Sequence, residues 1–402
     1  MVAMSKLYAP PYNVLPCSVL LLHEGVTCKQ LIWRNWYLCS LGCLRYFLPL
    51  AVSPLVLKPR SLNRQALLNI LRYYLETSLW GSTSTALVFS GICFFRHILG
   101  KYYLLSTIFL PTYSAFQLIW FYPIRTVRLY GTATTQAALE TWLRKQNHLI
   151  TKSLPLQTLI FMLSSAVILH FKRRGEFNGF WFIQPITNES KPKNVENMEN
   201  LKTKRKCDVH EGTTCTKYIL NGMSSYLMYG IPLDLLSTVF KGKMPRRLRE
   251  LKTIRFEMTA FFLSYVGIYR LSNCLLTRYT LYGTREHMLS AGLGGLSYFF
   301  LNKLAFAVLA LVLAVQAVWQ SYCSQHVEQP ENELSAFLKS IPFAKLAIPF
   351  NLAYLTHICI FHRHALSKVA GGFIRASTGN QFEQIYQNLT DLLAEHEKMR
   401  LK

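Results

Sequence analysis

Residues 287–319 constrain the fold of this chain more than any other stretch. Between the two ends of the stretch there is one charged residue, Lys303, beside Asn302. A bilayer core of about 30 Å is crossed by about 20 helical residues, and water-soluble helices are rarely so apolar on every face. One straight helix over this stretch would be roughly 50 Å long at 1.5 Å per residue, too long for a single span even with tilt. We therefore expect membrane helices here, with a break at Asn302 and Lys303.

Two arrangements of the break stay open. Either two short spans meet there at a membrane surface, or Lys303 is held in a polar interior. A hairpin of two spans puts the basic loop at 241–255 on one side of the membrane and the acidic loop at 321–338, which has no arginine, on the other. The positive-inside rule favours that arrangement.

The first half of this stretch has a row of small residues at helical spacing. They are Ser290, Ala291, Gly294, Gly295 and Ser297. Such a row lets helix backbones approach closely in lipid, where no hydrophobic force drives helices together. We expect this face to pack against another helix.

The composition agrees with a membrane protein. Charged residues make up 16% of the 402 residues and hydrophobic ones 51%, whereas about a quarter of a soluble domain is charged. The net charge of +24 is expected in loops that face anionic lipid head groups. Nucleic-acid binding is the other interpretation of such a charge, and the absence of any nucleic-acid motif in the sequence argues against it.

Further apolar runs predict an all-α, multi-pass helical membrane protein with about six to eight spans. The runs lie at 46–57, 77–95, 102–124, 154–171, 218–240, 256–276 and 341–361. Residues 129–143 are amphipathic and are expected outside the hydrocarbon, and residues 382–393 are expected to form an amphipathic tail helix.

The chain has an internal duplication. The sequence from His23 to Cys28, His-Glu-Gly-Val-Thr-Cys, recurs from His210 to Cys215 as His-Glu-Gly-Thr-Thr-Cys. Each copy precedes a segment apolar enough to span a membrane, and internal repeats of this kind are typical of transporter folds. We therefore predict two pseudo-repeated halves, each with a Cys/His segment and a membrane part, and a C-terminal tail. The boundaries are 1–176, a polar linker at 177–206, 207–361 and the tail at 362–402.

The duplication supplies two sets of soft metal ligands. They are Cys17, His23 and Cys28 in one half, and Cys207, His210 and Cys215 in the other. Zinc takes four nitrogen or sulfur ligands, or three and a water. Cys39 or Cys43 could complete the first set, but the second has no further Cys or His close by. Glu24 and Glu211 could be fourth ligands or orient the neighbouring histidines. These sets predict zinc as a candidate cofactor.

The alternative interpretation of the two sets is structural: their residues cap and pack the start of a span. The ten cysteines are too sparse for a disulfide scaffold. Cys93, Cys274 and Cys359 lie in or beside apolar stretches and are expected to pack as small hydrophobes.

No motif of a known catalytic site is present in the sequence, and we expect a protein that is not an enzyme. Glu76, Asp234 and Lys303 are polar residues near or inside apolar segments, and such residues are candidates for function in a membrane. Arg72 and Glu76 are one helical turn apart and are expected to form an ion pair.

Several separated blocks resemble the transmembrane protein 135 family, also called peroxisomal membrane protein 52. Over roughly residues 10–320, the blocks are Cys17 with His23 and Cys28, the sequence at 44–49, the sequence Cys-Phe-Phe-Arg-His-Ile-Leu-Gly-Lys-Tyr at 93–102, Ile268-Tyr-Arg270 with Cys274 and Arg278, and the small residues of 290–297. Together they are specific, although no single block is. Beyond about residue 340 the chain departs from the family pattern.

The resemblance implies a multi-pass protein of peroxisomal and mitochondrial membranes that takes part in peroxisome organisation, the mitochondrial fission balance and lipid handling. The expected function is that of a non-enzymatic scaffold or regulator, which recruits membrane-dynamics proteins to its basic loops. A carrier or pore for lipid or metabolite, built from two repeated halves, is the first alternative. A metal- or redox-sensing membrane protein is the second.

Overall fold

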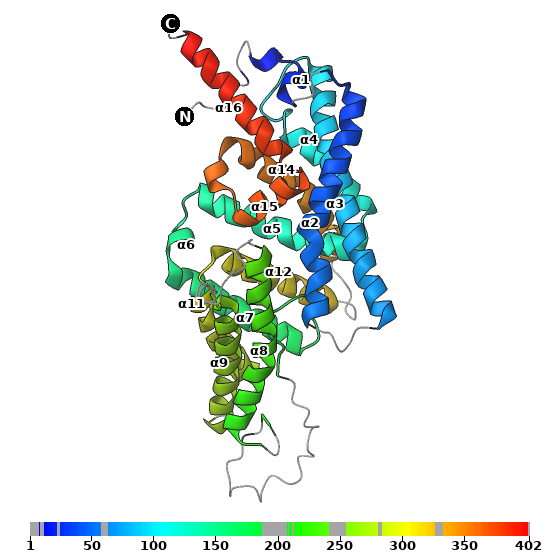
Figure 1. Ribbon diagram of the computed structural model, residues 1–402. Helices are drawn as coiled ribbons and strands as arrows, with labels where there is room; N and C mark the ends of the chain where they lie inside the picture. Colours follow the sequence, from blue (N-terminus) through cyan, green and yellow to red (C-terminus); the bar gives the residue numbers. More distant parts are fainter. Residues whose placement is uncertain are drawn as a thin grey trace, which may run out of the picture. The chain divides into compact units, whose positions relative to one another are not determined.

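The structure is a computed structural model, shown in Figure 1, and every regular element in its described ranges is a helix, which confirms the all-α class. It describes residues 8, 12–21, 25–57, 63–186, 207, 209–210, 213–240, 255–279, 284–325 and 333–400. The chain divides into two compact units. Unit 1 comprises Met1–His148 and Ile341–Lys402, and unit 2 comprises Leu149–Ser340. These boundaries differ from the predicted ones because C-terminal helices complete the N-terminal unit.

Unit 1 begins with a pair of long antiparallel helices, α2 (Cys28–Leu57) and α3 (Arg64–Leu99), which lie side by side in Figure 1. The Tyr74 hydroxyl donates a hydrogen bond to the Leu44 carbonyl, in the middle of α2, at 2.8 Å. Asn63 caps α3 by accepting from the Ala66 N–H at 2.7 Å. Gly100 ends α3 with a φ of +67°, in the left-handed region that suits glycine.

Residues 102–124 do not form the single span that their apolar composition predicts. They contain two short helices, α4 (Phe109–Ala115) and η4 (Phe116–Phe121), before α5 (Ile124–Lys145) begins. Pro111 lies in the first turn of α4, where its missing N–H needs no partner, and it stops α4 from extending further back. Pro123 stands at the start of α5 in the same way.

The C-terminal helices belong to the core of unit 1. They are α14 (Phe343–Phe361), α15 (Lys368–Ser377) and α16 (Gln381–Arg400). The predicted amphipathic tail helix lies within α16, and its apolar residues Phe382, Ile385 and Leu389 are buried. The Asn388 side chain also donates a hydrogen bond to the Val19 carbonyl at 3.2 Å.

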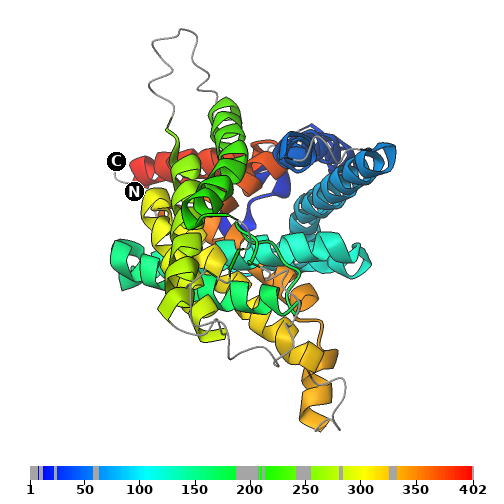
Figure 2. The same ribbon diagram turned by 90° about the horizontal axis from the view of Figure 1, so that it is seen from below.

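Unit 2 is built from six longer helices and several short ones. The longer ones are α7 (Leu154–Arg173), α8 (Cys215–Phe240), α9 (Glu257–Tyr279), α10 (Thr284–Gly294), α12 (Leu304–Gln325) and α13 (Glu333–Ser340). The short ones are α6 (Leu149–Lys152), η7 (Gly295–Ser297) and α11 (Tyr298–Leu301). Helices α8 and α9 form an antiparallel pair that is visible in Figure 1 and Figure 2, while α7 packs against α10 and α12.

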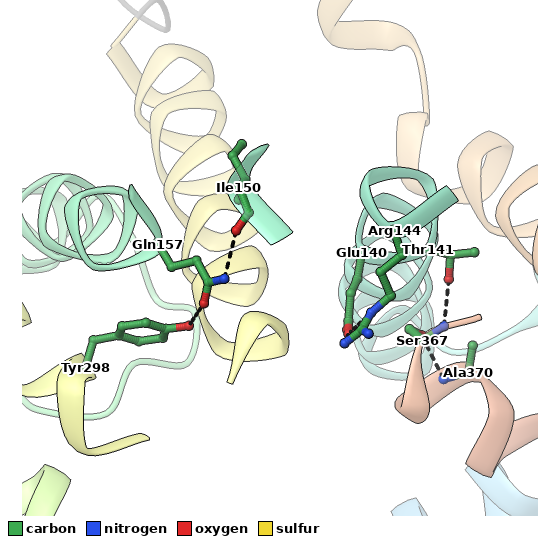
Figure 3. A network of polar contacts seen from close by, with 8 residues as sticks. All are labelled: Glu140, Thr141, Arg144, Ile150, Gln157, Tyr298, Ser367 and Ala370. Carbon is green, nitrogen blue, oxygen red and sulfur yellow. Dashed lines mark hydrogen bonds and ion pairs between the residues drawn. The ribbon is translucent and has the colours of Figure 1, made fainter. Parts of the chain in front are cut away.

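Each unit contains buried hydrogen bonds between its helices, and Figure 3 shows those of Gln157 in unit 2 and of Ser367 in unit 1. In unit 2 the Tyr298 hydroxyl donates to Gln157 Oε1 at 2.7 Å, and Gln157 Nε2 donates to the Ile150 carbonyl at 2.7 Å. In unit 1 the backbone N–H of Ser367 donates to Thr141 Oγ1 at 3.0 Å. Buried polar groups are costly unless they are hydrogen-bonded, so such ties fix how the helices pack.

The break predicted at Asn302 and Lys303 is confirmed. Helix α11 ends at Leu301, Asn302 has a φ of +38°, and α12 begins at Leu304. Lys303 is about half exposed and its Nζ pairs with Glu257 Oε2 at 2.6 Å. The structure thus favours an exposed turn over a lysine in a polar interior.

Five helices in the described ranges are long and apolar enough to cross a membrane: α2, α3, α7, α12 and α14. This supports a multi-pass membrane protein, while the predicted six to eight spans are not confirmed. Helices α8 and α9 occupy two of the predicted spans and are not among the five.

Candidate metal centres

Four soft ligands come together in unit 2. Cys207, His210, Cys215 and Cys274, called here the unit-2 cluster, place one ligand atom each within 4.8 Å of one another. His210 Nε2 lies 3.3 Å from Cys215 Sγ. Cys207 Sγ also lies 3.8 Å from the hydroxyl of Thr277, one turn beyond Cys274 in α9.

The antiparallel pair of α8 and α9 explains why these ligands meet. Cys215 is the first residue of α8, and Cys274 lies near the end of α9, which returns alongside α8. Cys207 and His210 precede α8 in the chain. Two segments that are far apart in sequence, residues 207–215 and the end of α9, therefore supply the cluster.

Aromatic and cationic neighbours hold the His210 ring. The ring stacks on Tyr218 with the centroids 4.7 Å apart, and the Arg270 guanidinium lies 4.4 Å from the centroid of the same tyrosine. Arg270 Nη1 also donates to the Tyr218 carbonyl at 2.6 Å. On the other edge of the imidazole, Thr213 Oγ1 lies 3.5 Å from Nδ1. Groups of this kind orient the ligands of a metal.

Three cysteines come together in unit 1 at the corresponding places of its helix pair. Cys17, Cys28 and Cys93, the unit-1 cluster, also have their sulfur atoms within 4.8 Å of one another. Cys17 Sγ and Cys28 Sγ are 4.0 Å apart. Cys28 is the first residue of α2, and Cys93 lies near the end of α3.

An arginine ties the unit-1 cluster to the segment before it. Arg96, one turn after Cys93, donates from Nε to the Leu15 carbonyl at 3.0 Å and from Nη2 to the Val14 carbonyl at 2.7 Å. Its guanidinium also lies 5.3 Å from the centre of the Tyr102 ring. Both clusters thus have an arginine that binds backbone carbonyl groups and lies over a tyrosine ring.

The sequence pattern found five of these seven ligands and missed two. Cys93 and Cys274 are buried among hydrophobic residues, as expected, and the structure also places each beside the repeated cysteines. Cys39 and Cys43, the proposed fourth ligands of the first set, are fully buried in the core of unit 1 and belong to neither cluster. They lie further along α2, on its face toward α3. His23, Glu24 and Glu211 lie outside the described residues.

The unit-2 cluster fits the chemistry of zinc. Three sulfurs and one imidazole nitrogen form a common tetrahedral set, and bonds of about 2.0–2.3 Å place ligand atoms roughly 3–4 Å apart. The His210–Cys215 distance of 3.3 Å already falls in that range, and 4.8 Å is the upper limit for the group. Small side-chain rotations would close the remaining distances.

The electrostatic setting of the unit-1 cluster favours neutral thiols when no cation is bound. Burial, followed by the neighbouring Cys28, raises the pKa of the Cys17 thiol. A metal cation reverses this preference because coordination deprotonates the thiols.

The predicted packing residues all lie in the interior of unit 2. Ser290, Ala291, Gly294, Gly295 and Ser297 are buried. A Cβ added at Gly294 would lie 2.8 Å from the Tyr265 ring in α9, and one at Gly295 would lie 2.7 Å from Met162 Cα in α7. The row of small residues therefore faces two helices.

The predicted polar residues have structural partners. Glu76 pairs with Arg72 Nε at 2.7 Å, as expected, and also with Arg125. The carboxylate of Asp234 is buried and accepts from the backbone N–H groups of Met258 and Thr259 at 3.1 and 2.9 Å, at the start of α9. A carboxylate in this position is stabilised by the orphan N–H groups and the dipole of the helix.

No family model matches the chain, and the comparisons with curated proteins and with solved structures also find no match.

Proposed function

We propose that this chain is a multi-pass organelle-membrane protein that acts as a non-enzymatic scaffold or regulator in peroxisome organisation and the mitochondrial fission balance. Its proposed location is the peroxisomal membrane, the mitochondrial membrane or both. Its basic loops would contact anionic lipid head groups and recruit membrane-dynamics proteins. The five apolar helices support the membrane part of this proposal.

One observation carries the rest: residues from separate blocks of the resemblance meet in space. The N-terminal block, with Cys17 and Cys28, meets the block at 93–102 through Cys93, and Arg96 of the same block binds the Leu15 carbonyl. A chance likeness between short blocks gives no reason for their cysteines to converge. The convergence supports the family relationship and the function that the family implies.

The two clusters also support the proposed duplication. In both units the last cysteine of the repeated motif is the first residue of a long helix, and the antiparallel partner of that helix brings back a further cysteine. We propose that the two helix pairs descend from one ancestral unit, with a cysteine-containing cluster at the same end of each pair.

Zinc bound by the unit-2 cluster is the proposed cofactor, with a structural role. The four ligands would clamp the segment before α8 onto the end of α9. Structural zinc sites are closed tetrahedral sites that add folding free energy directly. A complete set of protein ligands leaves no open position for a reacting water, as in other structural zinc sites.

The test of the metal proposal is the metal content of the full-length protein, purified in detergent without chelator. We expect zinc in the wild-type protein, a loss of about one ion per chain in Cys274→Ser, and no loss in Cys323→Ser, which removes a cysteine of α12 in the same unit. Wild-type protein without zinc, with Cys207 and Cys215 freely alkylated in the folded state, would contradict the proposal.

The test of the cellular proposal is rescue in cells that lack the chain. We expect the wild-type protein and Cys323→Ser to restore the number of peroxisomes and the length of mitochondria, and Cys274→Ser to fail or to restore them partly. Location in another membrane, or unchanged organelles in cells without the chain, would refute the organelle role and leave the metal result intact.

A further inference from the structure

Unit 1 contains an apolar cavity that neither cluster uses. Its volume is about 420 Å³, and it opens to the outside. Its walls come from α2, α5, α14 and α15, through residues such as Phe47, Ala133, Leu352 and Phe373. Ligand pockets have volumes of about 300–1,000 Å³, so the cavity is of the size that holds a small apolar molecule or chain.

Two of the three side-chain hydroxyls in the wall make hydrogen bonds within the protein, and Tyr46 carries the third. The Tyr130 hydroxyl donates to the Thr77 carbonyl at 3.3 Å, and Thr134 Oγ1 donates to the Tyr130 carbonyl at 2.7 Å. A wall of this kind offers few polar partners for ordered water. Its occupant is expected to be a hydrocarbon.

The position of the cavity indicates where that hydrocarbon comes from. Two of its four walls, α2 and α14, are among the helices that are long and apolar enough to cross a membrane. Acyl chains are the hydrocarbon that surrounds such helices. Acyl chains of the bilayer are therefore the hydrocarbon nearest to these two walls.

The helices that line the cavity carry exposed cationic residues next in sequence to lining residues. Four exposed cationic residues are direct sequence neighbours of lining residues, and no acidic residue holds such a position; the four are Arg45, Arg128, Lys368 and Arg375. A negatively charged head group at the opening would be complementary to them.

We propose that unit 1 binds one anionic phospholipid, with an acyl chain in the cavity and the phosphate against these cationic residues. This site is independent of the metal clusters and of the organelle role. It gives the protein a way to sense or hold a lipid of the membrane in which it resides.

The experiment uses full-length protein in nanodiscs that contain a diazirine-labelled acyl chain on either phosphatidylglycerol or phosphatidylcholine. We expect saturable labelling of peptides from α5 and α15, several-fold stronger with phosphatidylglycerol. Ala133→Phe fills the cavity and is expected to reduce this labelling about tenfold. The double variant Arg128→Gln and Lys368→Gln keeps the cavity and is expected to bring the two lipids to equal labelling.

Three results would overturn the proposal. Labelling spread evenly over all apolar helices would mean annular lipid only. Equal labelling by the two lipids in the wild-type protein would remove the head-group assignment. Displacement by free oleate but not by unlabelled phosphatidylglycerol would assign the cavity to a fatty acid. If Ala133→Phe does not fold, the wild-type peptide map and the double variant still decide the proposal.

Discussion

Gly295→Ala tests whether the row of small residues sets the distance between helices. The new Cβ would lie 2.7 Å from Met162 Cα and 3.1 Å from Met162 N, which are backbone atoms of α7. Carbon atoms in contact prefer about 3.5–4.0 Å, so η7 and α7 would have to separate by roughly 1 Å. Because a backbone cannot rotate away as a side chain can, we expect a cost near the upper part of the usual overpacking range of about 1–3 kcal/mol.

Gly292→Ala is the matched control, because Gly292 lies in the adjoining helix α10 and faces the same methionine. Its Cβ would lie 3.6 Å from the Met162 carbonyl oxygen, an ordinary contact. Replacement of a helical glycine by alanine gains up to about 1 kcal/mol. We therefore expect the control to be neutral or slightly stabilising.

The assay is thermal unfolding of the purified variants in one detergent. For a unit of this size about 2–4 °C is lost per kcal/mol, so Gly295→Ala is expected to lower the apparent Tm by several degrees relative to Gly292→Ala. The same Tm for both variants would refute the close packing of η7 on α7.

Three further predictions concern single polar contacts. Asp234→Ala is expected to destabilise the protein by about 1–3 kcal/mol, because alanine removes the acceptor of two backbone N–H groups. Asp234→Asn keeps one acceptor oxygen and is expected to destabilise it by less. Thermal unfolding measures both effects. Arg270→Lys is expected to increase the maleimide reactivity of Cys215, since lysine cannot both lie over Tyr218 and bind its carbonyl; unchanged reactivity would remove the orienting role. Lys303→Ala is expected to lower the free energy of unfolding by no more than a surface ion pair contributes, at most about 1 kcal/mol, and thermal unfolding measures this. A much larger loss of stability would favour a lysine in a polar interior.

Hydropathy predicted most helices and the break between two of them. Asn302 is a short polar residue that adopts the left-handed conformation more easily than others, and it stands in an apolar run too long for one span. Composition failed at 102–124 because apolar residues there hide the effect of Pro111 and Pro123 on helix boundaries. Hydrophobicity reports burial in lipid or protein, and it does not report where a helix starts.

The repeat predicted the ligands that are close in sequence. Cys207, His210 and Cys215 lie in one short segment, so their spacing alone suggested a site. Cys274 could not be found in this way, because its place beside them depends on the length of α8 and on the return of α9. One weak signal was present: the sequence Gly-Ile-Tyr-Arg at 267–270 loosely repeats Gly-Ile-Cys-Phe-Phe-Arg at 91–96, and it ends one helical turn before Cys274.

The division of unit 1 into two sequence segments has a consequence for synthesis. A ribosome releases the whole of unit 2 before it releases α14, α15 and α16, which complete the core of unit 1. Helices α2 to α5 therefore keep an uncovered face until α14, α15 and α16 are made. Unit 2 is complete before then and can already fold. Chaperones or insertion factors would be needed during that interval, and a chain that stops before residue 341 would lose the fold of its first helices, not of its last.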